Sequence, residues 1–467
     1  MVEHDQKFMG GSIYSMLLKY SSATIAAEVL EIVYSLADAA YIGLRSQIGL
    51  SGYSASEAIE YIVPVTGTLF MSGLNTQVSR LLSQNQTRII KNIFLWSLLI
   101  NTIASILLSI IIYFCLKPIQ AALNIIDDVQ VASTNYLIPI IWGAVVTSTF
   151  HLFQGFSLGL GQVKLYSLLT IGSMLLGIGI SPILTISLKL NEQGAGIARI
   201  LCNLIPVIVF FVYYIFYDKT IKPFSLISFG LKGEYSKQLV KAELKNVFNL
   251  GVSNMIMILL WTVYLAIQFN LVCGVAKNLN LYDDISAVFG VASRFQTLIL
   301  SFSTGINFGA LAQASYSDGQ KDSVRANKVL QLNFIYCAII SVFLAVICEA
   351  AAVPFLKIFS IVGTTQQIDV FRITVSIGFL QFTCLCTETT LQALDKATWA
   401  NVWIGVLSFL LIFIQLFVFW GTKHTTISDL YLQVASLLIT YVIILFWNIF
   451  VLLMTKKHNT KGKMQTT

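Results

Sequence analysis

Long apolar stretches recur from near the start of this chain to its end, and they limit its fold more than any other feature. Of its 467 residues, 56% are hydrophobic and only 11% are charged, whereas soluble globular proteins carry about 25% charged residues. Apolar stretches of about 20 residues are long enough to cross a bilayer as helices. Strands of a membrane β-barrel have only about 10 residues and alternate in polarity. The pattern therefore predicts an all-α polytopic membrane protein.

We expect about twelve transmembrane helices. Their approximate ranges are 14–42, 54–79, 92–116, 130–156, 164–188, 194–217, 247–273, 284–310, 329–353, 370–394, 401–421 and 429–454. The longest segment between spans, 218–246, follows the sixth span, and we interpret it as a cytoplasmic connecting loop. It divides the chain into an N-terminal six-helix bundle, 1–217, and a C-terminal six-helix bundle with a basic cytoplasmic tail, 247–467.

Lys and Arg residues are concentrated in the loops on one side of the predicted spans. An even number of spans puts both termini on that side, and the C-terminal tail is also basic. Because cytoplasmic loops are the ones enriched in Lys and Arg, we expect both termini in the cytoplasm and the protein in the plasma (cytoplasmic) membrane. The net charge of +7 is then explained by topology, and nucleic acid is not expected as a partner.

The two halves of the chain resemble each other. The segment "GLNTQVSRLLSQNQ" begins at Gly73 and "GINFGALAQASYSDGQ" begins at Gly305, an offset of 232 residues that also aligns Asp38 with Asn270. Parallel repeats that form a substrate site at their interface are typical of transporters. The repeat therefore predicts two pseudo-symmetric bundles and favours transport as the function.

Some of the same segments carry a resemblance to a known family. They are Arg294 followed by Gly305-Ile-Asn307-x-Gly309, then Tyr316-x-x-Gly319-x-Lys321, together with Asp38 followed by Tyr41-x-Gly43 in the first span. With these elements the chain resembles the multidrug and toxin extrusion (MATE) family, and more narrowly its bacterial-type members. The resemblance covers essentially the whole chain. It implies two six-helix bundles in a V shape around a central cavity, and export of amphipathic, usually cationic compounds driven by inward flow of H⁺ or Na⁺.

The chain departs from the family pattern where ions are coupled. In the fifth span, where the family often has Asn and Asp before a proline, Gly177 and Ser181 precede Pro182. The seventh span contains no acidic residue, and the acid of the tenth span, Glu388, lies about two turns from the expected place. Ion coupling therefore cannot be carried over from any one branch of the family, and H⁺ and Na⁺ both stay open.

The first span carries three carboxylates, Glu28, Glu31 and Asp38. Because a helix turns about 100° per residue, they share one polar face of that helix. A carboxylate in mid-membrane costs about 2.5–3.5 kcal/mol on insertion scales, so these three should face a watery cavity, pair with cations or donors, or be protonated. We predict that they form the ion-coupling site, where Asp38 could also bind Na⁺. A structural polar stripe is the alternative, and no other metal site or cofactor is expected.

Other polar residues inside the predicted spans are candidates for lining a substrate cavity. They are Tyr34, Asn75, Gln154, Tyr264, Gln268, Asn270, Arg294, Asn307 and Glu388. Hydrogen bonds that hold spans together are the alternative, and Arg294 and Glu388 could instead pair with each other. Arg199 and Glu60 are expected at the outer ends of their spans, where they reach solvent.

Three other classes of function compete with this prediction. An intramembrane enzyme is disfavoured, because the chain has no HExxH, no Cys/His metal spacing and only four His. A flippase for lipid-linked sugars, from the same wider superfamily, would need a more cationic cavity and stays as the alternative. A receptor or scaffold would show no flux.

The sequence thus predicts a secondary active antiporter for multidrug or xenobiotic efflux, which is not an enzyme. Small organic cations and the lipid bilayer are its expected partners, and a monomer is the expected form. Transport would proceed by alternating access, with the carboxylates of the first helix coupling it to H⁺ or Na⁺.

Overall fold

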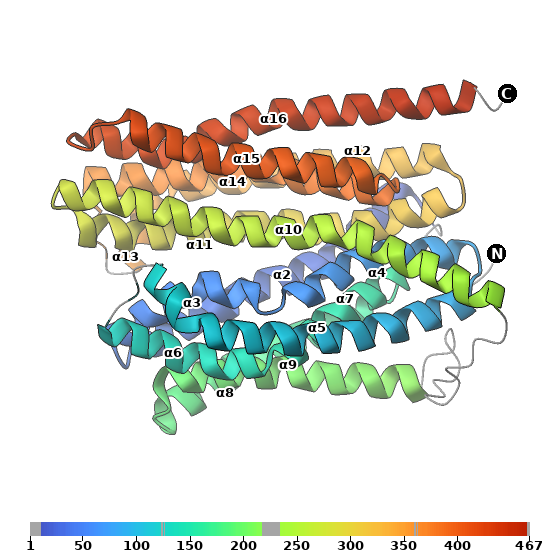
Figure 1. Ribbon diagram of the computed structural model, residues 1–467. Helices are drawn as coiled ribbons and strands as arrows, with labels where there is room; N and C mark the ends of the chain where they lie inside the picture. Colours follow the sequence, from blue (N-terminus) through green and yellow to red (C-terminus); the bar gives the residue numbers. More distant parts are fainter. Residues whose placement is uncertain are drawn as a thin grey trace. The chain divides into compact units, whose positions relative to one another are not determined.

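A computed structural model of the chain describes residues 11–122, 125, 127–216, 234–358, 361 and 363–464. In this part of the chain all regular secondary structure is helical. Figure 1 shows the helices, which are α2 (Ile13–Gly43), α3 (Gln47–Ile62), α4 (Val65–Ser83), α5 (Thr87–Ala122), α6 (Asp127–Trp142), α7 (Ala144–Gly159), α8 (Val163–Pro182), the π-helical turn η1 (Ile183–Ser187), α9 (Asn191–Phe216), α10 (Glu234–Asn278), α11 (Tyr282–Gly319), α12 (Ser323–Ala350), α13 (Ala352–Ile358), α14 (Thr365–Ala393), α15 (Ala397–Gly421) and α16 (Ile427–Met464).

Most of the predicted spans coincide with single helices. Within the described ranges, nine helices are long and apolar enough to cross a membrane, and the bent pair α6–α7 adds a tenth candidate. The α2 helix and the α3–α4 pair occupy the first and second predicted spans. The α2 helix carries Glu28, Glu31 and Asp38 and is not one of these nine helices.

Two predicted spans are broken rather than continuous. The span predicted at 54–79 is interrupted between α3 and α4 at Pro64, because proline has no N–H to continue the helical hydrogen bonds. The span predicted at 130–156 bends by 58° between α6 and α7. The connecting loop predicted at 218–246 is helical from Glu234, where α10 begins, and its first part, 218–233, lies outside the described residues.

Contacts group the chain into two compact units. Unit 1 comprises Met1–Thr262 and Phe308–Val329, and unit 2 comprises Val263–Asn307 and Leu330–Thr467. The helices α10 and α11 therefore contribute to both units. The division into bundles 1–217 and 247–467 follows sequence order rather than contacts, and it stays a prediction, as does the V shape.

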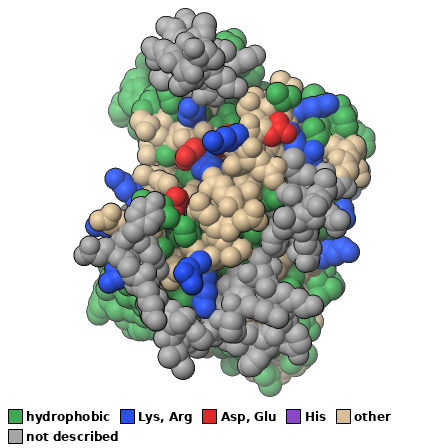
Figure 2. Space-filling model, turned by 90° about the vertical axis from the view of Figure 1, so that its right-hand side faces the viewer, with side chains coloured by type: hydrophobic (Ala, Val, Ile, Leu, Met, Phe, Trp, Pro, Cys, Tyr) green, Lys and Arg blue, Asp and Glu red, His purple; other side chains and the backbone are tan. Residues whose placement is uncertain are grey.

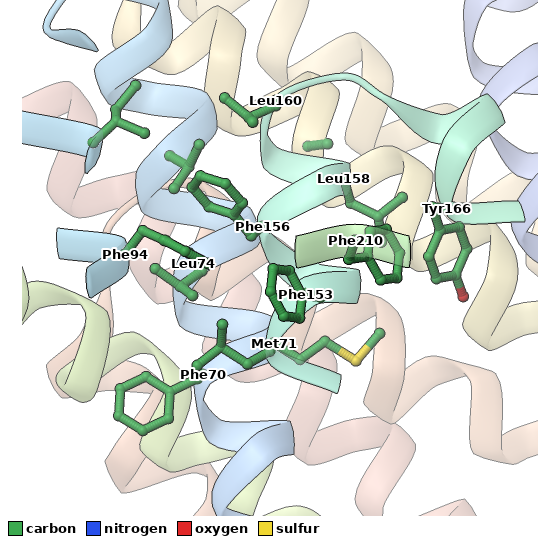
Figure 3. Close-up of a cluster of buried hydrophobic side chains, with 14 of the residues drawn as sticks. Phe70, Met71, Leu74, Phe94, Phe153, Phe156, Leu158, Leu160, Tyr166 and Phe210 are labelled. Atoms are coloured by element: carbon green, nitrogen blue, oxygen red, sulfur yellow. The ribbon is translucent and has the colours of Figure 1, made fainter. Parts of the chain in front are cut away.

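Aromatic side chains fill the interior of unit 1. The ring of Phe153 on α7 stacks on Phe210 of α9, with centroids 5.3 Å apart and planes at 5°, and Phe94 of α5 lies 4.1 Å from Phe156. Figure 3 shows these rings together with residues of α4 such as Phe70. Because lipid is as apolar as these side chains, close packing rather than water exclusion stabilises such helix contacts.

One end of unit 1 is basic. The turn after α4 lies beside the turn after α7, since Ser79 Oγ donates to the Gly159 carbonyl oxygen at 3.2 Å. Arg80 also pairs there with Asp318 of α11 at 3.4 Å. Figure 2 shows a face of the molecule on which Lys and Arg predominate over Asp and Glu among the coloured charges. A basic end agrees with the predicted cytoplasmic side, and the orientation itself stays a prediction.

Candidate functional site

Asp38 is the most deeply buried of the three α2 carboxylates. Its exposed fraction is 0%, and its Oδ1 accepts a hydrogen bond of 2.5 Å from Ser181 Oγ at the end of α8. Its Oδ2 has no hydrogen-bond partner, and neither has the hydroxyl of Tyr34, buried one turn earlier on α2. Unsatisfied buried polar atoms are costly and uncommon. These two atoms need an explanation, which the predicted ion-coupling role of Asp38 would supply.

The end of α8 brings its residues against α2. Pro182 is the last residue of α8, and η1 follows it. One turn before Ser181, Gly177 faces the ring of Tyr34, and a Cβ atom there would lie 2.8 Å from both Tyr34 Cε2 and Cys202 Sγ. At the two positions where the family often has Asn and Asp, Gly177 therefore contacts Tyr34 and Ser181 contacts Asp38. The hydroxyl of Ser181 supplies a donor, but it adds no charge.

Arg199 of α9 lies between two carboxylates beside Tyr34. Its Nε is 2.5 Å from Glu60 Oε1 on α3, and its Nη2 is 3.7 Å from Glu31 Oε1 on α2. The guanidinium carbon lies 5.7 Å from the centre of the Tyr34 ring, within the range of a cation–π interaction. The expectation that Arg199 and Glu60 reach solvent is wrong. Their side chains are only 19% and 14% exposed, because α3, α6 and α9 pack together there.

Glu60 is also held by a tyrosine. The hydroxyl of Tyr136 on α6 donates to Glu60 Oε2 at 3.0 Å. Glu60 and Arg199 are close enough for their charges to act on Asp38, and Glu31 likewise acts on Glu28. We call Glu28, Glu31, Asp38, Glu60 and Arg199 the carboxylate cluster. It holds four carboxyl groups and one permanent cation.

Glu28 links the carboxylate cluster to the aromatic interior. Its Oε1 accepts a hydrogen bond of 3.2 Å from the hydroxyl of Tyr166 on α8, whose ring belongs to the buried group in Figure 3. The three residues predicted to couple ions therefore share one face of α2, as their spacing indicates. In the described chain no three His, Cys, Asp or Glu side chains form a metal-like group, and Na⁺ at Asp38 stays a prediction.

The other cavity residues predicted in unit 1 lie outside the carboxylate cluster. Asn75 of α4 donates to the Phe308 carbonyl oxygen at 3.4 Å, and its own Oδ1 has no hydrogen-bond partner. Gln154 of α7 bonds His151 Nδ1 at 2.9 Å and Thr170 Oγ1 at 3.5 Å. Of the predicted cavity residues in this unit, only Tyr34 adjoins Asp38 and Arg199.

Three predicted cavity residues of unit 2 join helices by hydrogen bonds. Gln268 of α10 donates to the Gln433 carbonyl oxygen of α16 at 3.2 Å. The hydroxyl of Tyr264 accepts from Gln381 Nε2 of α14 at 3.1 Å. Asn307 Oδ1 of α11 accepts from Asn333 Nδ2 and Thr389 Oγ1, each at 2.8 Å. Such bonds agree with the packing alternative, and the cavity role of these residues stays a prediction.

The remaining three residues lie on α10, α11 and α14. Asn270 donates to the Ala266 carbonyl oxygen of its own helix at 2.9 Å. Glu388 is buried and accepts from Gln392 Nε2 at 2.9 Å, and Arg294 is half-buried. The cavity role of these three residues, and the alternative pairing of Arg294 with Glu388, stay predictions.

Known proteins resemble this chain in sequence over one part and in fold over nearly all of it. The sequence profile of the MatE family matches residues 23–183, which run from α2 to the end of α8. No curated protein matches the chain.

Several solved structures share the fold. A multidrug resistance MATE family transporter of the MOP superfamily, in an outward-facing conformation, has a TM-score of 0.81 at 14% identity, covering 98% of this chain and 99% of that one. A MATE transporter of Vibrio cholerae, solved as an aspartate-to-asparagine mutant, gives 0.79 at 14% identity over 96% and 97% of the two chains. A MOP superfamily transporter from Pyrococcus furiosus gives 0.80 at 14% identity over 96% and 98%.

The profile match and the fold together confirm the resemblance to the MATE family and the all-α, twelve-helix fold class. At 14% identity, the solved structures show only that the fold is shared. The match to the MatE family model supports a membrane transporter rather than an enzyme.

Proposed function

We propose that this chain is a secondary active antiporter that exports amphipathic organic cations in exchange for H⁺ or Na⁺. The observation that carries the proposal is Asp38, fully buried on α2 with one carboxylate oxygen unpartnered, in a region with three further carboxyl groups. Carboxylates inside membrane-spanning segments are expensive and are characteristic of ion and proton pathways. In this protein the buried carboxylates would attract an amphipathic cation that partitions from water into the membrane.

The coupling follows from competition for negative charge. A proton or Na⁺ that binds at Asp38 removes one negative charge from the carboxylate cluster, so the cluster attracts cationic cargo less strongly. By thermodynamic linkage, bound cargo weakens binding of the coupling ion by the same factor. If the site opens to the two sides of the membrane in turn, inward flow of the ion then drives cargo outward. The proposal places the protein as a monomer in the plasma membrane.

The test is ethidium efflux from proteoliposomes that contain the purified chain. Efflux driven by an imposed pH gradient identifies H⁺ as the coupling ion, and efflux driven by an imposed Na⁺ gradient identifies Na⁺. Absence of flux under both gradients would contradict the proposal and favour the flippase for lipid-linked sugars.

The variant Asp38→Asn tests the residue that carries the proposal. Asparagine has nearly the same shape but cannot ionise, so uphill efflux should fall to the level of empty liposomes while the chain still folds and inserts. The control is Asp128→Asn, which removes an exposed carboxylate at the start of α6. Uphill efflux by Asp38→Asn at the wild-type rate would refute the role of Asp38.

A further inference from the structure

Arg199 is held unequally by its two carboxylate partners. Glu60 is close, at 2.5 Å from Nε, and it is fixed by the hydroxyl of Tyr136 at 3.0 Å. Glu31 is farther, at 3.7 Å from Nη2, and its side chain is 36% exposed. A pair at that distance with a solvated partner is weak. The arginine is therefore anchored at Glu60 and only loosely engaged at Glu31.

The guanidinium of Arg199 also has an unused hydrogen-bond donor. Arg199 Nη1 is buried without a hydrogen-bond partner, although a guanidinium has five N–H donors to satisfy. The central carbon of the guanidinium lies 5.7 Å from the centroid of the Tyr34 ring. The guanidinium is therefore stabilised in its present position mainly by Glu60 and by the ring of Tyr34.

The guanidinium has the chemistry of the cargo that the carboxylate cluster would bind. It is flat, carries a delocalised positive charge, is weakly hydrated and stacks on aromatic rings. An amphipathic organic cation would use the same two partners, a carboxylate and an aromatic face. Glu31 and Tyr34 can therefore serve the arginine or the cargo, but one cation excludes the other from this place.

We propose that Arg199 is a tethered competitor of the cationic cargo, anchored by Glu60 and displaced from Glu31 and Tyr34 when cargo binds. The inference rests on the proposed function and adds a specificity-determining residue to it. Cations that stack well on Tyr34 and pair with Glu31 can displace the arginine. Small inorganic cations bring no aromatic contact and are disfavoured, so the cargo class is flat organic cations with delocalised charge.

Removing the arginine and removing its anchor, Glu60, should have opposite effects on cargo binding. The variant Arg199→Gln removes the competitor, so the dissociation constant for ethidium should fall by about tenfold. The variant Glu60→Gln removes the anchoring charge and leaves Glu31 as the main partner of Arg199. The arginine should then compete more strongly, and the dissociation constant should rise by about tenfold. A purely structural ion pair predicts shifts in the same direction for both variants.

The measurement is ethidium fluorescence anisotropy with the full chain in detergent at one fixed alkaline pH. The initial efflux rate against ethidium concentration in proteoliposomes should show the same opposite shifts in KM, with smaller changes in kcat. The matched control is Arg88→Gln, which removes an exposed arginine at the start of α5. Thermal unfolding verifies that each variant is folded, and Arg199→Lys replaces Arg199→Gln if the latter does not fold. Lysine is a strongly hydrated point charge that stacks poorly, so it should also bind ethidium more tightly than wild type.

Equal affinities in all folded variants, or shifts of Arg199→Gln and Glu60→Gln in the same direction, would overturn the inference. If wild type exports ethidium under a gradient while either of these results is found, only the competitor role fails. If neither wild type nor Arg199→Gln binds or exports ethidium, the competitor role fails together with the proposed function.

Discussion

At the scale of single residues, burial separates the carboxylates of α2 into different roles. Asp38 is inaccessible and has one neutral donor, Ser181, whereas Glu31 is partly solvated and faces Arg199. A carboxylate with a single hydroxyl donor is poorly stabilised when charged, because the rest of its hydration is not replaced. Under the proposed function, Asp38 therefore suits the binding of a coupling ion, and Glu31 suits a cargo that arrives from water.

The variant Ser181→Ala tests this residue-scale argument. It removes the donor to Asp38 Oδ1 and leaves the carboxyl with no hydrogen bond from α8, so efflux should slow several-fold. The free energy of unfolding should fall by about 1–3 kcal/mol. The measurements are initial efflux rates and thermal unfolding in detergent. The control is Ser408→Ala on α15, whose hydroxyl bonds only the backbone of its own helix in the described contacts. Equal behaviour of the two variants would show that the bond to Asp38 is unimportant.

The sequence predicted the carboxylates of α2 but missed Arg199 and Glu60. A charged residue within an apolar stretch can be recognised from the sequence alone. Arg199 and Glu60 lie near the ends of their predicted spans, and this position led to the wrong prediction that they contact solvent. A signal was present nonetheless. Ala195, Ala198 and Cys202 of α9 are all buried, and helical spacing puts Arg199 on the same inward face. Its partners on α2 and α3 could not be predicted, because pairing depends on how three helices pack.

At the scale of helices, close crossings depend on residues without side chains. Where α7 crosses α4, a Cβ atom on Gly155 would collide with the Met71 carbonyl oxygen. Small residues at such crossings let membrane helices approach, which increases van der Waals contact. The α4–α7 contact is one side of the aromatic interior of unit 1. This crossing therefore supports the packing of that interior, which Tyr166 links to Glu28.

The variant Gly155→Ala should destabilise unit 1 by about 1–3 kcal/mol, because backbone atoms cannot move aside for a methyl group. The matched control is Gly172→Ala on α8, where a Cβ atom meets nothing within 4 Å. That substitution should be neutral or stabilising by up to about 1 kcal/mol, because alanine favours the helix. Thermal or denaturant unfolding measures both changes. A Gly155→Ala protein as stable as Gly172→Ala would show that the crossing relaxes freely.

At the scale of the whole molecule, the distribution of Lys and Arg predicts the orientation in the membrane. The turns at one end of unit 1 carry Arg80, Arg88, Lys164 and Lys321, while the connection between α5 and α6 has only Lys117 nearby. Basic loops stay on the cytoplasmic side during insertion. The same argument predicts that the C-terminal tail lies in the cytoplasm.

Reporter fusions in a bacterial host test this orientation. Green fluorescent protein fused to the end of the chain should fluoresce, and alkaline phosphatase at the same place should be inactive, because each reporter folds on only one side of the membrane. Fusions placed in the connection between α5 and α6 should give the reverse pattern. Active phosphatase at the C-terminus would show that the charge distribution does not set the orientation.

The sequence by itself determined what depends on composition and local spacing. Apolar length predicted membrane-spanning helices, helical periodicity placed Glu28, Glu31 and Asp38 on one face, and the residues around Gly305 pointed to the MATE fold. Only the tertiary structure decided which groups meet. Ser181 reaches Asp38 across 143 positions of sequence, and Arg199 reaches Glu60 and Glu31 from a third helix. Such contacts arise from helix packing, whose side-chain partners no local pattern encodes.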